Sequence, residues 1–189
     1  KGEEGAIKAV SDLAGVPINH VVSVDFDGVK GIVDKLGGVT VKVPPKTTYG
    51  GVSVPEGVQK LDGVQALTFA RVRKTYASGD YQRTDNQRQL VKAVAKEILA
   101  TPVNKLPGVA ESITSAVNTD MPLTKLISLS LKMRGMDIDK MYNAVLPSAP
   151  KTINGASYVV VKEAEWKTMM ERVKAGLPPL EEKAPDAAK

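Results

Sequence analysis

The stretch "INHVVSVDFDGVKGIVDKLGGVTVKVP", residues 18–44, decides the class of fold. Residues 18–26 are rich in β-branched side chains and predict a strand. Residues 27–38 predict a short helix, because four apolar side chains recur on one helical face. These are Val29, Ile32, Val33 and Leu36. Residues 39–44 predict a second strand, which a proline ends. A strand, a helix and a strand in close succession indicate an α/β arrangement of layers.

The periodicity of apolar side chains predicts further elements on both sides of this stretch. Helices are expected at residues 3–14, 61–73, 81–100, 103–117, 122–134 and 163–176. Asp62 is positioned to cap the helix that follows it. A small hairpin is expected at "YGGVSVPEG", and late strands are expected at residues 140–147 and 156–162. Residues 177–189 have the proline-rich, charged composition of a flexible tail.

Composition limits the kinds of function that are open to the chain. The net charge of +5 favours an anionic partner, such as nucleic acid, a phosphorylated substrate or an anionic surface polymer. The absence of cysteine excludes thiolate metal sites, cysteine nucleophiles and disulfides. No apolar run approaches the roughly 20 residues that cross a bilayer, and no signal peptide is recognisable. Because the chain opens at Lys1 without a methionine, we expect it to be a processed or truncated piece.

Basic residues gather in "RVRKTYASGDYQRTDNQRQ", residues 71–89. Arg71 and Arg73 precede a short polar turn, and Arg83 lies in the first turn of the helix that follows. A cation in the first turn opposes the helix dipole and is locally unfavourable, which suggests another use for it. Free backbone N–H groups at a helix N-terminus bind phosphate, and arginines add forked hydrogen bonds. Pyrophosphate is an anion that would suit this arrangement.

Two interpretations of this basic segment stay open on the residues alone. Arginines beside aspartates often form plain surface salt bridges, each worth roughly 0–1 kcal/mol. The alternative is an anion-binding cleft. The predicted helix at residues 81–100 has a broad apolar stripe in its second half and almost no apolar side chain in its first half. Because the first half is not needed for packing, it is free to line a cleft.

The other candidates for a site are weaker. His20 is the only histidine, and we interpret it as a packed or edge residue rather than a metal ligand. The sequence "DFDG" places Asp25 and Asp27 near a strand end, where they could hold a divalent ion. A helix cap formed by Asp27 is the preferred interpretation. No P-loop, GxGxxG, GxSxG or HExxH motif occurs.

Three blocks of the sequence resemble the LytR-CpsA-Psr family. "ALTFARVRKTYASGDYQRTDNQRQLVKAV" (66–94) resembles its signature segment, "GVPINHVVSVDFDGVKGIVDKLGGVTVKVP" (15–44) the preceding strand–helix–strand unit, and "LDGVQALTFAR" (61–71) its lead-in helix. The resemblance implies a mixed central β-sheet flanked by α-helices in three α-β-α layers. It implies a bacterial phosphotransferase that moves a glycopolymer from a polyprenyl pyrophosphate carrier to peptidoglycan or another cell-envelope acceptor. The glycopolymer would be a teichoic acid, capsular polysaccharide, arabinogalactan or protein-linked glycan.

The resemblance also assigns site residues, position by position. Arg71 and Arg73 match the paired arginines of an RxR motif, and Asp80 matches the aspartate that opens the next motif. Arg83 and Gln87 match the pyrophosphate-facing arginine and glutamine of that motif. The implied pyrophosphate-binding residues are therefore Arg71, Arg73, Arg83 and Gln87. The implied catalytic residues are Arg73, Arg83 and Asp80, with Asp80 positioning Arg83 or helping to bind the acceptor or a metal. The arginines would neutralise charge that develops on the leaving phosphate.

The chain departs from the family pattern in several places. Gln82 stands where many members have glycine, and Asn86 where many have arginine, so neither receives a role. The family's N-terminal half, with metal-binding aspartates, another pyrophosphate arginine and a membrane helix, has no counterpart here. We therefore expect residues 1–176 to be the C-terminal part of a single catalytic domain, with an incomplete sheet and residues 177–189 as its tail. The resemblance implies Mg²⁺ as cofactor, with ligands in the missing part.

Two rival functions belong to other classes. A non-catalytic module would bind anionic wall polymer or polyprenyl phosphate without turnover. Nucleic-acid binding is disfavoured, because the basic segment lacks a series of aromatic residues for stacking bases. The expected location is the extracytoplasmic face of a bacterial membrane, with anchoring by an N-terminal helix that this chain does not contain.

Overall fold

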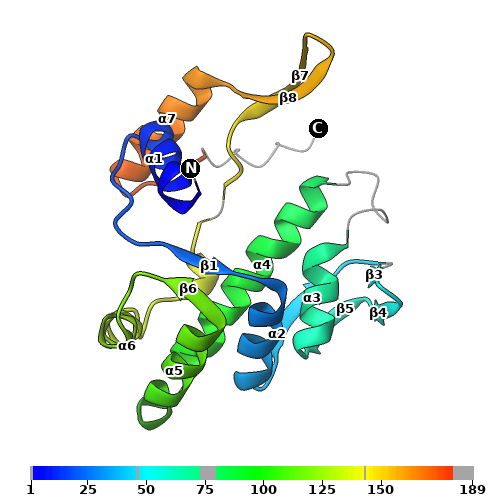
Figure 1. The fold of residues 1–189 in the computed structure, drawn as a ribbon, viewed down its shortest axis with the longest axis vertical. Helices are drawn as coiled ribbons and strands as arrows, with labels where there is room; N and C mark the ends of the chain where they lie inside the picture. Colours follow the sequence, from blue (N-terminus) through cyan, green and yellow to red (C-terminus); the bar gives the residue numbers. More distant parts are fainter. Residues whose placement is uncertain (1, 46, 73–79, 143, 181–189) are drawn as a thin grey trace, which may run out of the picture. The chain divides into compact units, whose positions relative to one another are not determined.

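The computed structural model describes residues 2–45, 47–72, 80–142 and 144–180. The chain divides into two compact units, Lys1–Ile138 and Asp139–Lys189. The first unit contains most of the helices and strands (Figure 1). The single domain expected over residues 1–176 stays a prediction.

The first unit begins and ends with helical elements. Its helices are α1 (Glu3–Ala14), α2 (Phe26–Lys35), α3 (Gly63–Arg71), α4 (Asp80–Ala100), α5 (Leu106–Ala116) and α6 (Leu123–Lys132), with a short 3-10 turn at Val103–Lys105. A second 3-10 turn, Ile138–Lys140, begins at the last residue of this unit. Its strands are β1 (Val22–Val24), β2 (Val39–Val43), β3 (Thr47–Tyr49), β4 (Val52–Val54), β5 (Gly57–Leu61) and β6 (Val117–Thr119). Each helix that the sequence predicts in this unit is present.

The strands pair in short antiparallel ladders. β1 pairs with β6, β2 with β5 and β3 with β4. The α/β composition is therefore confirmed, and the predicted hairpin corresponds to β3 and β4. In place of one wide central sheet, the described residues form two-stranded ladders. The predicted strand–helix–strand unit is present as β1, α2 and β2, although its two strands pair with other partners.

The core of the first unit lies between β2, α3 and α4. Val39, Val41 and Val43 of β2 are buried, while the intervening residues are exposed. This alternation turns one face of the strand inward. Phe69 of α3 and Leu90 of α4 complete the same apolar cluster. Burial of apolar surface of this kind is the main source of folding stability.

The helices α2 and α3 run side by side in opposite directions (Figure 1). The N–H of Gly63, at the start of α3, donates to the Asp34 carboxylate near the end of α2 over 2.8 Å. A Cβ at Gly63 would collide with the backbone of Lys30, so only glycine permits this approach. At the other end, Arg71 closes α3 beside Phe26, the first residue of α2.

Helix caps confirm one prediction and correct another. Asp62 caps α3, as predicted, and the structure adds that it forms a capping box with Gln65. The cap of α2 is Asp25, whose carboxylate accepts the N–H of Gly28 over 2.7 Å, and not the expected Asp27. Asp25 is the N-cap because α2 begins at Phe26, one residue earlier than predicted. Asp27 therefore lies inside the first turn.

The strand expected at residues 18–26 is confined to Val22–Val24. Before this strand, side chains accept hydrogen bonds from backbone N–H groups that a longer strand would have paired with its neighbour. The N–H of Ile18 donates to the Ser11 hydroxyl, and the N–H of Val21 donates to the Asp120 carboxylate. The strand is limited further by its partner β6, which has three residues.

The second unit contains β7 (Ser148–Ile153), β8 (Ala156–Val161) and α7 (Glu163–Lys174). The strand predicted at residues 140–147 is wrong, because β7 lies in the stretch that the prediction left as a connection. Asn154 and Gly155 both have positive φ, at 50° and 78°, and form the turn between β7 and β8. A two-residue Asn-Gly turn fixes the register, so Ile153 faces Ala156 and the pairing extends from there.

Candidate functional site

The predicted site lies where α3 ends and α4 begins. Arg71 is the last residue of α3, and Arg83 is half-buried in the first turn of α4. Arg73 lies outside the described residues. Asp80 is the first residue of α4, and its side chain is not among those described. The structure therefore places the two ends of the predicted site in one unit, on neighbouring helices.

Arg71 contacts aromatic rings. The central carbon of its guanidinium lies 4.0 Å from the ring centre of Phe26 and 4.5 Å from that of Tyr49, at the end of β3. Both distances lie within the range of cation–π attraction, which is worth about 0.5–2 kcal/mol. These contacts could not be predicted from the sequence, because Phe26 and Tyr49 are distant from Arg71 along the chain.

Amide side chains of α4 bind the last carbonyl groups of α3. Asn86 is fully buried, and its Nδ2 donates to the Phe69 carbonyl over 2.9 Å. Its Oδ1 accepts a hydrogen bond from the Gln82 amide over 3.0 Å. Gln87 donates to the Ala70 carbonyl over a longer distance of 3.3 Å. Carbonyl groups at a helix C-terminus lack partners within the helix, so these bonds fix the start of α4 against the end of α3.

Asn86 and Gln82 were the two departures from the family pattern that received no role. The structure joins them in one partly buried hydrogen bond, in which the Gln82 amide donates and the Asn86 Oδ1 accepts. Asparagine is a poor helix former, but its burial and its partner on α3 become visible only in the structure.

Arg88 behaves as the salt-bridge interpretation predicted. Its Nη2 lies 2.8 Å from the Asp85 carboxylate, one turn earlier on α4. Both side chains are partly exposed, so the pair contributes roughly 0–1 kcal/mol. By contrast, the ion pairs found among the described residues do not include Arg71. The salt-bridge interpretation therefore describes Arg88, whereas the anion-site interpretation stays open for Arg71.

An apolar pocket of about 260 Å³ lies beside the second half of α4. Its walls come from β1, α2, α4, α5 and β6. The lining residues are Val22, Val24, Val29, Ile32, Leu90, Val91, Val94, Ile98, Ile113 and Val117. Arg83 and Leu90 are seven residues apart, which is about 10 Å along a helix. One helix therefore carries a cation near its start and an apolar pocket wall farther along.

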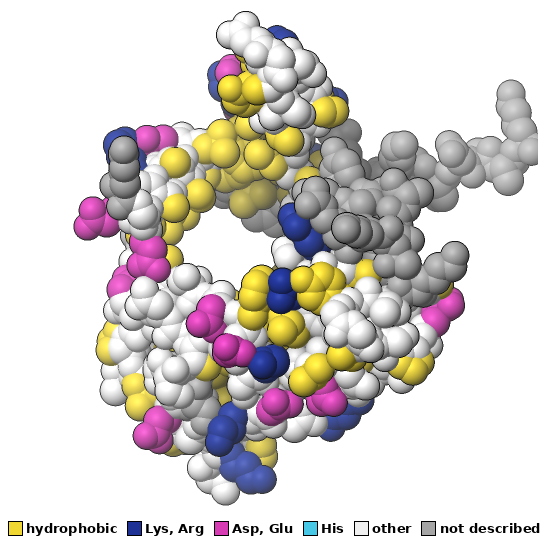
Figure 2. All heavy atoms as spheres, turned by 45° about the vertical axis from the view of Figure 1, so that its right-hand side comes forward, with side chains coloured by type: hydrophobic (Ala, Val, Ile, Leu, Met, Phe, Trp, Pro, Cys, Tyr) yellow, Lys and Arg dark blue, Asp and Glu magenta, His cyan; other side chains and the backbone are white. Residues whose placement is uncertain are grey.

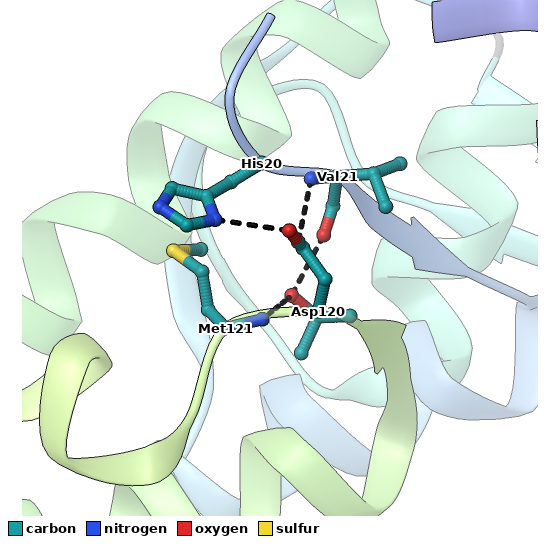
Figure 3. Close-up of polar contacts among 5 residues, drawn as sticks. His20, Val21, Asp120 and Met121 are labelled. Atoms are coloured by element: carbon teal, nitrogen blue, oxygen red, sulfur yellow. Dashed lines mark hydrogen bonds and ion pairs between the residues drawn. The ribbon is translucent and has the colours of Figure 1, made fainter. Parts of the chain in front are cut away.

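His20 has a partner 100 residues away in the sequence (Figure 3). Its Nδ1 lies 3.0 Å from one carboxylate oxygen of Asp120, and the other oxygen accepts the N–H of Val21 over 2.9 Å. The Thr119 hydroxyl donates to the Val21 carbonyl over 2.7 Å. The Val21 N–H, followed by His20, holds the pKa of the Asp120 carboxyl below its ordinary value. His20 thus helps to fasten the segment before β1 to the end of β6.

The described residues do not supply a metal site. Within them, no group of three or more histidine, aspartate or glutamate side chains is arranged to hold a metal ion. Asp25 is used as a helix cap, and Asp27 lies 2.8 Å from the Lys30 ammonium, which lowers the Asp27 pKa. The Mg²⁺ that the resemblance implies therefore stays a prediction.

The surface view does not show one continuous basic patch. On the face drawn in Figure 2, the described lysine and arginine side chains lie among acidic and apolar ones. Nucleic-acid binding depends on basic groups that follow the phosphate backbone. This face therefore gives no support to the nucleic-acid alternative. Among the described helices, none combines the length and apolar character that a membrane span requires.

The chain belongs to the LytR_cpsA_psr family, whose model matches residues 1–175. It is similar to the polyisoprenyl-teichoic acid–peptidoglycan teichoic acid transferase TagU of Halalkalibacterium halodurans, with 30% identity over 178 residues. That match covers 93% of this chain and 58% of the transferase. The transferase TagV of Bacillus subtilis is 29% identical over 152 residues, covering 74% of this chain and 38% of TagV.

Solved structures share the fold. The crystal structure of B. subtilis TagV matches with a TM-score of 0.80 and 25% identity, covering 93% of this chain and 70% of that chain. A protein from Enterococcus faecalis, described as a transcriptional regulator, matches with a TM-score of 0.79 and 27% identity, covering 95% of this chain and 67% of that chain. The chain spans 58% of the length of the H. halodurans transferase, so it corresponds to part of such a protein.

Proposed function

We propose that the protein transfers a glycopolymer from a polyprenyl pyrophosphate carrier to peptidoglycan or another acceptor of the bacterial cell envelope. Membership of the family supports this, as do the relatives that are named as teichoic acid transferases. The polymer could be a teichoic acid, capsular polysaccharide, arabinogalactan or protein-linked glycan. The reaction would take place at the extracytoplasmic face of the membrane, where such carriers and acceptors meet.

The observation that carries the proposal is the division of α4 into two halves. Its first half holds Arg83 and Gln87 beside the end of α3, and its second half forms one wall of the apolar pocket. A polyprenyl pyrophosphate donor has the same division, with a charged head and an apolar chain. An apolar pocket with a few polar groups at one end is the usual form of a site for such a ligand.

The arginines would act on the pyrophosphate. Arg71, which contacts two aromatic rings, and Arg83, in the first turn of α4, would hold it together with Arg73. Gln87 would donate a hydrogen bond to a phosphate oxygen, and Asp80 would position Arg83 or help to bind the acceptor. Fixed cations beside the leaving phosphate stabilise the charge that develops there.

The bond changes follow from the donor and acceptor. An acceptor hydroxyl oxygen forms a bond to the phosphorus that carries the glycan. The bond from that phosphorus to the bridging oxygen breaks, and polyprenyl monophosphate leaves with the electron pair. The hydroxyl proton passes to water. Mg²⁺ remains a prediction from the resemblance.

Arg83→Ala tests the proposal, with Arg88→Ala as the matched control from the same helix. Transfer of labelled glycopolymer from a polyprenyl-linked donor to peptidoglycan is measured with the full-length protein. Arg83→Ala should lower the rate by about 100-fold or more, as the loss of a group that stabilises transition-state charge does. Arg88→Ala should keep the rate, because Arg88 is paired with Asp85. Wild-type transfer by Arg83→Ala would contradict the proposal.

The same assay separates catalysis from binding alone. A non-catalytic module would bind the donor without transferring the glycan, whatever residue stands at position 83. Full-length wild-type protein that binds the donor and shows no transfer in the presence of Mg²⁺ would favour that alternative.

A further inference from the structure

The aromatic partners of Arg71 are not explained by packing of the core. Phe26 and Tyr49 are 54% and 38% exposed, and neither belongs to the apolar cluster between β2, α3 and α4. Large apolar side chains at a surface gain little from burial. Their shared contact is the guanidinium of Arg71, which both approach within 4.5 Å. The arrangement therefore gives these two rings a role that involves Arg71.

The fold brings the three side chains together from separate elements. The antiparallel packing of α2 against α3 places Phe26, at the start of α2, beside Arg71, at the end of α3. The β3–β4 hairpin also packs against α3 and brings Tyr49 to the same charge. No short segment of the sequence contains this cluster, which explains why the residues alone did not predict it.

Ring contacts of this kind change how an arginine binds an anion. A free arginine side chain samples many rotamers and loses that freedom when it binds. Contacts with two rings restrict the side chain before the ligand arrives, so less freedom remains to be lost. A guanidinium donates hydrogen bonds within its own plane, at its edges, so a ring against its face does not compete for these donors. The rings can thus hold Arg71 and leave its N–H groups for phosphate.

We propose that Phe26 and Tyr49 are positioning residues that fix the guanidinium of Arg71 for the pyrophosphate of the donor. The inference rests on the proposed function, in which Arg71 binds that pyrophosphate. The rings act through Arg71 and do not touch the phosphate. Their contribution depends on an aromatic face. Phenylalanine can therefore take the place of Tyr49 without loss of affinity, whereas an aliphatic side chain such as leucine cannot.

A double-mutant cycle tests the inference in the full-length protein. The affinity for geranylgeranyl pyrophosphate is measured by titration calorimetry for the wild type, Tyr49→Leu, Arg71→Ala and the double variant. Tyr49→Leu should weaken binding by about two- to tenfold, and Tyr49→Phe should keep the wild-type affinity. In the Arg71→Ala background, Tyr49→Leu should have no further effect, because the interaction it removes is already lost.

The outcomes distinguish the inference from the proposed function. Wild-type affinity in Arg71→Ala would show that Arg71 does not bind the pyrophosphate. That result would contradict both the positioning role of the rings and the proposed role of Arg71. A loss in Arg71→Ala without a loss in Tyr49→Leu would overturn only the positioning role. Equal losses from Tyr49→Leu in both backgrounds would also overturn it, because Tyr49 would then act independently of Arg71.

Two further measurements guard against a general loss of structure. Phe26→Leu tests the second ring from a different element and should repeat the pattern of Tyr49→Leu, including the absence of effect in the Arg71→Ala background. Affinity for geranylgeraniol, which has no phosphate, should stay at the wild-type value in every ring variant. A parallel loss for geranylgeraniol would show that the variants damage the apolar pocket, and this would contradict the inference.

Discussion

The two halves of α4 are held in place by different interactions. In the first half, the buried Asn86 and its neighbours bind the end of α3 through directional amide hydrogen bonds. In the second half, Leu90 and Ala93 are buried in the apolar core, and residues beside them line a pocket. This difference shows that hydrogen bonds can hold the start of a helix in place with little apolar burial. Its remaining polar surface is then available for a charged ligand.

The largest expected effect lies in the apolar half. Leu90→Ala should lower the free energy of unfolding by about 2–5 kcal/mol, because it removes buried methyl groups and leaves a cavity. The adjacent control, Val91→Ala, should change it by less than about 0.5 kcal/mol, because Val91 is 67% exposed. Urea unfolding followed by circular dichroism measures both. Equal losses from the two variants would show that burial does not distinguish these positions.

A smaller effect is expected in the polar half. Asn86→Leu should lower the free energy of unfolding by about 1–3 kcal/mol, because the Phe69 carbonyl would lose its buried donor. Gln87→Leu should lower the free energy of unfolding by less than about 1 kcal/mol, because the hydrogen bond from Gln87 to the Ala70 carbonyl is longer and the Gln87 side chain is exposed. If Asn86→Leu unfolds at the wild-type urea concentration, hydrogen bonds are not what fixes the start of α4.

The smallest effect concerns the strand that forms one wall of the apolar pocket. The folded-state pKa of Asp120 is lowered, chiefly by the N–H of Val21 just before β1. A lowered folded pKa contributes stability that is present above the unfolded pKa of about 4 and is lost as the pH falls through the folded value. The stability difference between the wild type and Asp120→Asn should therefore shrink between about pH 5 and about pH 3.

Chemical unfolding at a series of pH values measures this difference. His20→Gln serves as the companion variant, because it removes the second group that lowers the Asp120 pKa and keeps the Val21 bond. It should reduce the pH dependence without abolishing it. A difference between the wild type and Asp120→Asn that is constant over this range would show that the carboxylate of Asp120 does not contribute.

The elements that the sequence predicted correctly are those with a local cause. The periodicity of residues 81–100 predicted both the length of α4 and the contrast between its halves. Asp62 predicted the start of α3, because a helix cap lies next to the turn that it caps. The strand predicted at residues 140–147 failed because the prediction did not use Asn154 and Gly155, whose turn decides which residues pair.

The contacts that the sequence did not predict join distant segments. Arg71 was expected at an anion site, yet nothing near it in the chain pointed to Phe26 or Tyr49. Asn86 received no role because it departs from the family pattern, and its partner, the Phe69 carbonyl, belongs to the backbone of another helix. Side-chain spacing identifies which residues share a face, but packing between elements decides what that face contacts.

The central claim is that the two halves of α4 bind the two parts of one amphiphilic donor. The most direct test compares the affinity of the full-length protein for geranylgeranyl pyrophosphate in the wild type, Arg83→Ala and Val91→Asp. Val91 lines the pocket and is exposed, so an aspartate there opposes the apolar chain without disturbing the core. The account predicts that each variant weakens binding by about tenfold or more. Wild-type affinity in either variant would contradict it.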